Sequence, residues 1–160
     1  MSKVVIADAG PLIAFARLQL LDLLPRVFDR VLVTEAVLVE CAGRPDFPES
    51  LPIQEAVSRQ MFERCMPLDF SAYQFEVDDG EASTIAAAIE CGSGVLMDDR
   101  AGRRMATHIG IPMIGTVGVL VLAKRKGLVP SVKPLLERLV ASGYFLGDEI
   151  IAAALAAVGE

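Results

Sequence analysis

The sequence has few of the residues on which many enzyme sites depend. It contains one histidine, His108, and no tryptophan in 160 residues. A second histidine ligand for a metal is therefore missing, and a Ser-His-Asp triad would have to use His108, which we interpret as a helix-end residue. The three cysteines, Cys41, Cys65 and Cys91, are odd in number, far apart and without a CxxC spacing. This pattern predicts reduced thiols and indicates neither disulfides nor a zinc site.

Long apolar runs and basic residues are also scarce. No run approaches the roughly 18 apolar residues that span a bilayer, and the start MSKVVIADAG predicts a first strand and no signal peptide. We therefore expect a cytoplasmic protein without membrane contact. The 15 Lys and Arg residues are outnumbered by 21 Asp and Glu residues, for a net charge of -6. Such a chain binds nucleic acid poorly, because Lys and Arg hold the phosphates, unless a bound cation or a dimer that aligns arginines offsets the acidity.

Apolar content and periodicity predict the fold class. Hydrophobic residues make up 53% of the chain, enough for a packed core, and the length suits one domain over residues 1–160. Short apolar runs predict four strands, at 3–7, 30–33, 95–97 and 112–116. Helical spacing predicts helices at 12–24, 36–41, 53–64, 79–91, 102–109, 117–126, 131–141 and 148–158, with a loop at 44–52. This alternation favours a parallel sheet covered on both faces, an α/β sandwich.

Acidic residues follow the predicted strands. Asp8 closes the first strand, and Asp98 and Asp99 close the third, while Glu40 and Glu81 lie on nearby helices. Ligands of open parallel sheets bind outside the carboxyl ends of the strands, so we expect four or five carboxylates to meet in one cleft. Carboxylates in close proximity repel each other, and all-oxygen ligation suits Mg²⁺ or Mn²⁺. A bound ion of this kind can activate a water and shield a phosphodiester.

Each of these acids also has a purely structural interpretation. Asp8 can serve as the N-cap of the helix that follows it, and Glu40 as a solvated helix residue. Glu81 can interact with the dipole of the helix that it begins. Asp98 and Asp99 can form a turn or a cap before the next helix. Their shared placement after strands or at helix ends is what favours a common site.

Three arginines and one threonine lie close to the acids in the sequence. Arg100, Arg103 and Arg104 fall on the helix directly after Asp99. They can position RNA phosphates, or they can form a solvated face or ion pairs with carboxylates. Thr116 follows the fourth predicted strand, where it can support a carboxylate by hydrogen bonding or cap the next helix. Of these two roles for Thr116, capping is the one we favour.

Six short motifs occur in an order that is similar to a known family. They are D-x-x-P-L-I at Asp8–Ile13, V-x-x-E at Val37–Glu40, G-E-x-x-x-I-x-x-A at Gly80–Ala88, D-D-x-x-x-R-x-x-A at Asp98–Ala106, G-T-x-G-x-L at Gly115–Leu120 and A-K-x-K-G at Ala123–Gly127. Together they cover nearly the whole chain. The sequence resembles PIN domains, and among them the group of small prokaryotic proteins related to toxin nucleases.

This resemblance implies a three-layer α/β/α fold and a metal-dependent endoribonuclease that cleaves single-stranded RNA with Mg²⁺ or Mn²⁺. The catalytic positions implied are Asp8, Glu40, Glu81 and Asp99. The metal-ligand candidates are Asp8, Glu81, Asp98 and Asp99, with Asp99 preferred over Asp98. The resemblance also implies an RNA substrate and an antitoxin partner protein, and we expect a homodimer in which the helix at 53–64 forms an interface.

The sequence departs from the family pattern at two positions. Glu81 stands where many PIN nucleases carry Asp, and many carry Ser or Thr just before the last acid, where this chain reads Met97-Asp98-Asp99. A catalytically inactive PIN-like module that binds a protein partner or RNA is therefore the alternative function. A phosphate-handling α/β hydrolase would need Asp8 as its nucleophile, and beyond Thr116 and Lys124 the chain has no obvious helper pattern for it.

Overall fold

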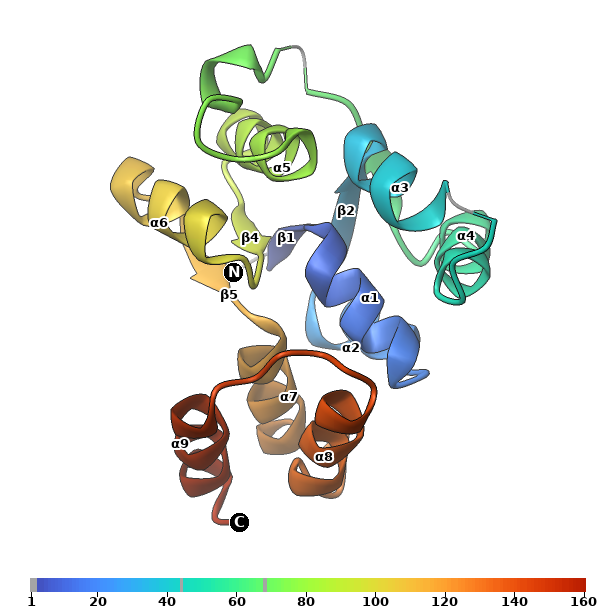
Figure 1. Ribbon diagram of the computed structural model, residues 1–160, viewed down its shortest axis with the longest axis vertical. Helices are drawn as coiled ribbons and strands as arrows, with labels where there is room; N and C mark the ends of the chain where they lie inside the picture. Colours follow the sequence, from blue (N-terminus) through green and yellow to red (C-terminus); the bar gives the residue numbers. More distant parts are fainter. Residues whose placement is uncertain (1–2, 44, 68) are drawn as a thin grey trace.

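A central parallel sheet organises the fold. The computed structural model describes residues 3–43, 45–67 and 69–160. Within them, five strands form one sheet in the order β3-β2-β1-β4-β5, and every neighbouring pair is parallel. The strands are β1 (Val4–Ala7), β2 (Arg30–Thr34), β3 (Glu63–Cys65), β4 (Gly94–Leu96) and β5 (Met113–Ile114). Helices cover both faces of the sheet (Figure 1), so the predicted three-layer α/β/α arrangement is confirmed.

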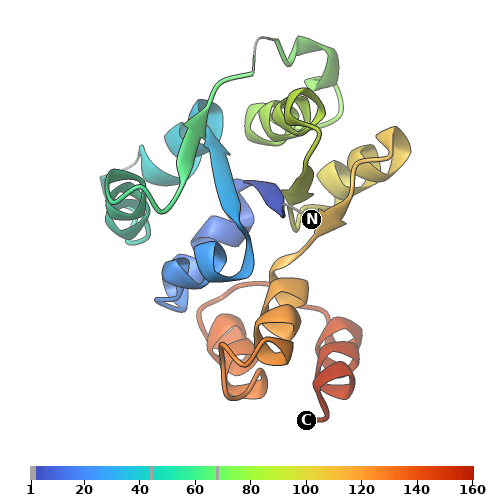
Figure 2. The ribbon, with the colours of Figure 1, turned by 180° about the vertical axis from the view of Figure 1, so that it is seen from behind.

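The helices of the described residues form the two outer layers. The α-helices are α1 (Ala9–Arg17), α2 (Leu24–Val27), α3 (Glu35–Ala42), α4 (Ser50–Ser58), α5 (Asp79–Cys91), α6 (Arg100–Ile109), α7 (Thr116–Arg125), α8 (Lys133–Ala141) and α9 (Asp148–Val158), and the 3-10 helices are η1 (Leu21–Leu23) and η2 (Ser71–Tyr73). In Figure 1, α5 and α6 lie above the sheet, and α1, α2, α7, α8 and α9 lie below it. Figure 2 shows β3 and β5 at the two edges of the sheet. No helix in this part of the chain has the length and apolarity needed to cross a membrane.

Alternating side chains of the strands divide the core into two layers. Val5 and Ala7 of β1 pack with the helices of the lower layer, whereas Ile6 between them packs with α5 and α6. The parallel register places Ile6 beside Leu32 of β2 and Val95 of β4, and these three share one cluster. Successive side chains of a strand point to opposite faces. Because both faces are covered, the central strands consist of unbroken apolar runs.

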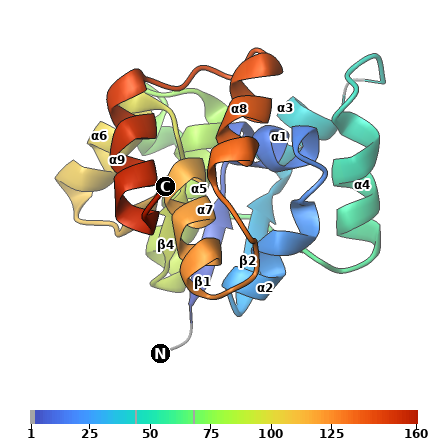
Figure 3. The same ribbon diagram turned by 90° about the horizontal axis from the view of Figure 1, so that it is seen from below.

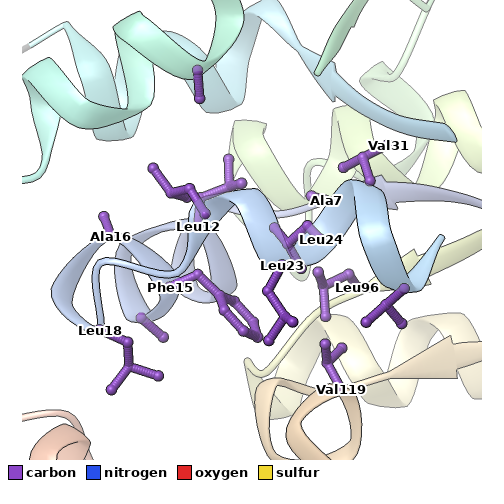
Figure 4. Packing of buried hydrophobic residues seen from close by; sticks show 14 of the residues in the cluster. Ala7, Leu12, Phe15, Ala16, Leu18, Leu23, Leu24, Val31, Leu96 and Val119 are labelled. Atoms are coloured by element: carbon purple, nitrogen blue, oxygen red, sulfur yellow. The ribbon is translucent and has the colours of Figure 1, made fainter. Parts of the chain in front are cut away.

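Phe15 of α1 lies at the centre of the larger core layer. Its side chain and that of Leu12 are fully buried. Figure 4 shows the Phe15 ring lying close to Leu23, with Val119 of α7 in the same cluster. Burial of a side chain of this kind stabilises a fold by about 1.5–3 kcal/mol. This packing anchors α1, and therefore fixes the helix whose first residue follows Asp8.

Two glutamines with a left-handed backbone end helices that the sequence predicts to be longer. Gln19 has a φ of 58° and interrupts the predicted helix at 12–24, so that α1 is followed by η1 and α2. Gln60 has a φ of 60° and follows α4. Left-handed conformations are uncommon outside Gly, Asn and Asp. The sequence therefore carries no signal for either break.

The region between α3 and β3 differs most from the sequence prediction. The predicted loop at 44–52 is wrong from Ser50 onward, because α4 begins there, and Arg44 lies outside the described residues. The Ser50 hydroxyl donates to the Ala42 carbonyl at 2.6 Å and fastens α4 to the end of α3. The predicted helix at 53–64 extends too far, since its last two residues belong to the edge strand β3. Charged, exposed residues in β3 give no alternating apolar pattern.

Glu160 caps the start of α8 from a distant point of the chain. Its carboxylate accepts hydrogen bonds from the Ser131 hydroxyl at 2.6 Å and from the backbone N–H groups of Val132 and Lys133, each at 2.9 Å. Lys124 Nζ lies 3.7 Å away. The hydrogen bonds, the one from Ser131 first, lower the pKa of Glu160 from 4.5 to about 2. The carboxylate therefore joins the end of the chain to α7 and α8.

We expect Glu160→Gln to lower the free energy of unfolding at pH 7, because the charged form accepts stronger hydrogen bonds. A carboxyl group with a depressed pKa contributes stability above its ordinary pKa, and that stability is lost as the pH falls through the folded-state value. The gap between wild type and variant should therefore be full above about pH 4.5 and shrink toward pH 2. Urea unfolding followed by circular dichroism measures this difference in the free energy of unfolding. The matched control is Glu137→Gln, at an exposed residue of α8. A gap that does not change with pH would contradict the capping role.

Candidate active site

The sheet changes its direction of growth at the junction of β1 and β4. From β1 the chain adds β2 and β3 on one side, and then β4 and β5 on the other. Open parallel sheets bind ligands at such a switch point, outside the carboxyl ends of the strands. Asp8 follows β1, its backbone N–H donates to the Leu96 carbonyl of β4 at 2.9 Å, and Asp98 and Asp99 follow β4. Figure 3 shows the connection between α8 and α9 at this same end of the sheet, away from the N-terminus.

Asp8 is a buried carboxylate with one oxygen left without a partner. It occupies the N-cap position of α1, yet its side chain makes no capping hydrogen bond. The residue is 5% exposed, and Oδ1 has no hydrogen-bond partner among the described residues. Burial, and then the charges of Glu81, Glu40 and Asp78, raise the pKa of Asp8 well above its usual value. The missing capping bond disfavours the purely structural interpretation of this residue.

Glu81 combines a structural role with burial in the same region. The Asp78 side chain accepts from the Glu81 backbone at 2.8 Å, and the Glu81 side chain accepts from the Asp78 backbone at 3.1 Å. This capping box stabilises the start of α5. Glu81 is only 8% exposed, and burial, followed by the charge of Asp78 and contact with Asp99, raises its pKa to about 7. Its carboxyl group is therefore close to both Asp78 and Asp99.

Glu40 reaches the start of α5 through the space that Gly80 leaves. A Cβ added at Gly80 would overlap Oε2 of Glu40, although Glu40 as a whole is exposed. The two helices are tied together beneath this contact. The Thr34 hydroxyl accepts from the Val37 backbone at 3.3 Å and lies 2.7 Å from the Ser83 hydroxyl. This buried bond holds α3 against α5 and brings Glu40 toward the acids of β1 and α5.

Asp98 is fully engaged by hydrogen-bond donors. Its Oδ1 accepts from the Thr116 backbone at 2.8 Å, and its Oδ2 accepts from the Thr116 hydroxyl at 2.5 Å and from the Tyr144 hydroxyl. The favoured capping role for Thr116 is wrong, because Gly115 is the N-cap of α7 and Thr116 holds the carboxylate instead. Tyr144 also lies over the start of α1, where a Cβ on Gly10 would be 3.5 Å from its hydroxyl. Burial, and then Asp98, raise the pKa of Tyr144.

Asp99 is the more open member of the pair. Its Oδ2 accepts from the Gly102 backbone at 3.0 Å and caps α6, so the predicted helix-cap interpretation holds for it. The residue is exposed, and its side chain contacts that of Glu81. Asp98 therefore ties together the ends of β4 and β5, while Asp99 faces the buried acid of α5. The preference for Asp99 as the ligand stays a prediction.

The three arginines after the acids differ in their surroundings. Arg103 donates to the Met97 carbonyl at 3.4 Å and lies against Gly115, so it supports the ends of β4 and β5. Arg104 lines a surface pocket, and Arg100 is exposed. Among the residues that the structure describes, none of the three forms an ion pair with a carboxylate. The predicted alternative of ion pairing is therefore not supported there.

The sequence analysis missed three residues of this region. Asp78 belongs to a D-x-x-E capping pattern that was readable from the sequence. Ser83 lies in a run of small residues in which nothing distinguishes it from its neighbours. Tyr144 is separated from Asp98 by 46 positions. Only the path of the chain after α8 brings its phenol to the acids.

The chemistry of the donor set fits a divalent cation, although no coordination shell is already formed. Within residues 3–43, 45–67 and 69–160, no three Asp, Glu, Cys or His side chains are spaced to hold one ion together. The buried, unpartnered Oδ1 of Asp8 and the raised pKa of Glu81 both indicate uncompensated carboxylates. Carboxylate oxygens are the ligands that Mg²⁺ and Mn²⁺ prefer. Rotation of exposed side chains such as Asp99 would be needed to complete a shell.

The structure combines a parallel α/β/α sheet with acids at its switch point. The family model described as "PIN domain" (DUF3368) matches residues 4–160 of the chain. The chain therefore belongs to the PIN-domain family, whose members are in general nucleases, and the family resemblance seen in the sequence is confirmed. None of the curated proteins compared with the chain matches it.

We expect Asp8→Asn to leave the free energy of unfolding unchanged or to raise it at pH 7 in the presence of a chelator. The substitution removes a buried charge that other carboxylates repel. Chemical denaturation of both proteins measures the difference. Asp46→Asn, which neutralises an exposed loop residue, controls for the change in net charge. A clear loss of stability in Asp8→Asn alone would mean that the carboxylate stabilises the fold at the start of α1.

We expect Tyr144→Phe to lower the free energy of unfolding by about 1–2 kcal/mol, because it removes a hydrogen bond to a charged acceptor while keeping the ring. The matched control is Tyr73→Phe. The Tyr73 hydroxyl makes no hydrogen bond within the part of the chain that the structure describes. Denaturant unfolding of the two variants provides the comparison. Equal effects of both substitutions would contradict a specific bond between Tyr144 and Asp98.

Proposed function

We propose that this protein is a divalent-metal-dependent ribonuclease that cleaves single-stranded RNA. The observation that carries the proposal is the buried Asp8 carboxylate, whose Oδ1 lacks a partner at the β1–β4 switch point and is surrounded by other acids. Burying a carboxylate oxygen without a hydrogen-bond partner costs the fold free energy. We infer that the arrangement serves a function, because clustered carboxyl groups with shifted pKa values are typical of active sites.

We assign the acids different roles. Asp8, Glu81 and Asp99 would hold Mg²⁺ or Mn²⁺, with Glu40 completing the catalytic set. When bound, the ion would supply an activated water and would offset charge on the phosphodiester. Asp98 would act as a positioning residue, because Thr116 and Tyr144 already occupy its oxygens.

One observation favours a second candidate, a PIN-like module that binds a partner or RNA without cutting it. The described acids are not spaced as a finished metal site. A module of this kind would keep the fold and the buried acid while losing ion affinity. The melting temperature with and without Mn²⁺ separates the two, because only a binding site gives a metal-dependent rise.

The proposal extends to partners and location. We propose that the chain acts as one domain in the cytoplasm and that it forms a homodimer. Leu51 is 62% exposed on α4, the helix that we expect at the interface. An antitoxin protein as partner rests on the family resemblance alone.

We expect wild-type protein to cleave one single-stranded RNA only with Mg²⁺ or Mn²⁺, and Asp8→Asn and Asp99→Asn to cleave it about 100-fold more slowly, or about 2.7 kcal/mol in barrier height. Each substitution removes a carboxylate that would hold the ion. Initial rates on a labelled RNA, resolved on denaturing gels, measure the loss. Asp46→Asn is the matched control with an exposed acid outside the site.

Three outcomes would contradict the proposal in different ways. Equal rates in wild type and Asp8→Asn would indicate a contaminating nuclease. Cleavage that persists in chelator would rule out the metal-dependent mechanism. Metal binding without cleavage of any RNA would favour the non-catalytic module.

A further inference from the structure

A surface pocket lies between η2 and α6, outside the cluster of acids. It has a volume of about 820 Å³ and is lined on one side by Tyr73, Phe75 and Glu76 and on the other by α6 residues that include Arg104 and His108. The Phe75 residue is 78% exposed, although it is aromatic. Exposed aromatic side chains beside a hollow are typical of binding surfaces.

The charges of the pocket are arranged unevenly across it. Arg104 and His108 lie on the α6 wall, and neither forms an ion pair in the described part of the chain. Glu76 lies on the opposite wall. Its carboxylate repels a phosphate but accepts hydrogen bonds from the amino groups of bases. A phosphate therefore fits the α6 wall, and a base fits the wall of Tyr73, Phe75 and Glu76.

The same helix connects this pocket to the acids. Asp99 caps the start of α6, and Arg104 follows five residues later. At 1.5 Å per residue, Arg104 lies about 7–8 Å along the helix from Asp99, and His108 about 13 Å. These lengths correspond to a short stretch of nucleic acid strand. A strand that reached the acids would therefore pass the pocket within a few nucleotides.

We propose that this pocket binds an unpaired base of the RNA strand next to the cleavage position, with the base stacked on Phe75 and Tyr73 and its phosphate held by Arg104. The inference rests on the proposed ribonuclease function and specifies where the flanking strand is held. Stacking on aromatic side chains is the usual way in which single-stranded RNA is recognised. It also explains how an acidic chain holds RNA, since a local contact replaces a general basic surface.

The experiment measures binding in chelator, so that it does not depend on cleavage. Fluorescence anisotropy of a labelled cytidine oligoribonucleotide is compared with that of an abasic ribose-phosphate oligomer of the same length. We expect Phe75→Ala to weaken binding of the cytidine oligomer about ten-fold and to leave the abasic oligomer unaffected. We expect Arg104→Ala to weaken binding of both and to reduce the salt dependence by about one phosphate contact. The matched controls are Ile150→Ala on α9 and Arg26→Ala on α2, both exposed residues outside the pocket.

The possible results separate this inference from the proposed function. Wild-type affinity in both Phe75→Ala and Arg104→Ala would overturn the pocket. If either variant sediments differently from wild type but keeps wild-type RNA affinity, the proposed base-binding pocket is overturned as well. That result would indicate that the pocket is a protein interface. If RNA binding depends on the pocket but the protein cuts no RNA, only the proposed ribonuclease function is contradicted. Cleavage with binding that is independent of the pocket would contradict only this inference.

Discussion

The burial of the Asp8 carboxylate is the constraint on which the acidic end of the sheet depends. A carboxylate oxygen without a hydrogen-bond partner is unfavourable in a protein interior, and burial, followed by the charges of three further acids, raises the pKa of Asp8. Asp98, two residues beyond the neighbouring strand, is treated in the opposite way, since Thr116 and Tyr144 bond both of its oxygens. The fold therefore provides hydrogen-bond donors for both oxygens of Asp98, whereas Oδ1 of Asp8 has none among the described residues and Asp8 lies near other acids.

The sheet and the helix caps hold these acidic residues in place. Asp8 is fixed through its backbone, which continues the pairing of β1 with β4. Glu81 is fixed by the capping box with Asp78, and Asp99 by the bond from Gly102. The helix-start hydrogen bonds therefore fix the positions of these acids, while burial raises the pKa values of Asp8 and Glu81. Rigid placement on helix and strand ends is what a site needs if it is to bind an ion without reorganising the fold.

Much of the fold and part of the site could be predicted from the sequence. The central strands are apolar on both faces, so β1, β2 and β4 are readable as unbroken runs, and Asp8 stands out because it ends one of them. The edge strand β3 could not be predicted, because its residues are charged and exposed. Gln19 and Gln60 end helices in a conformation for which their residue type gives no signal. Tyr144 depends on tertiary packing alone, since no local pattern connects it with Asp98.

Tyr144 makes the C-terminal helices part of the acidic end of the sheet. Its hydroxyl bonds Asp98 from the connection between α8 and α9, and Glu160 closes α9 onto the start of α8. Parts of a protein open locally with free energies below that of global unfolding. An opening confined to residues after α7 would remove a donor from Asp98 and uncover Gly10 while the sheet stays intact. Amide hydrogen exchange in α8 and α9 would then report on how firmly the Asp98 carboxylate is held. The free energy that keeps this acid in place is therefore that of the local opening after α7, which can be smaller than the free energy of global unfolding.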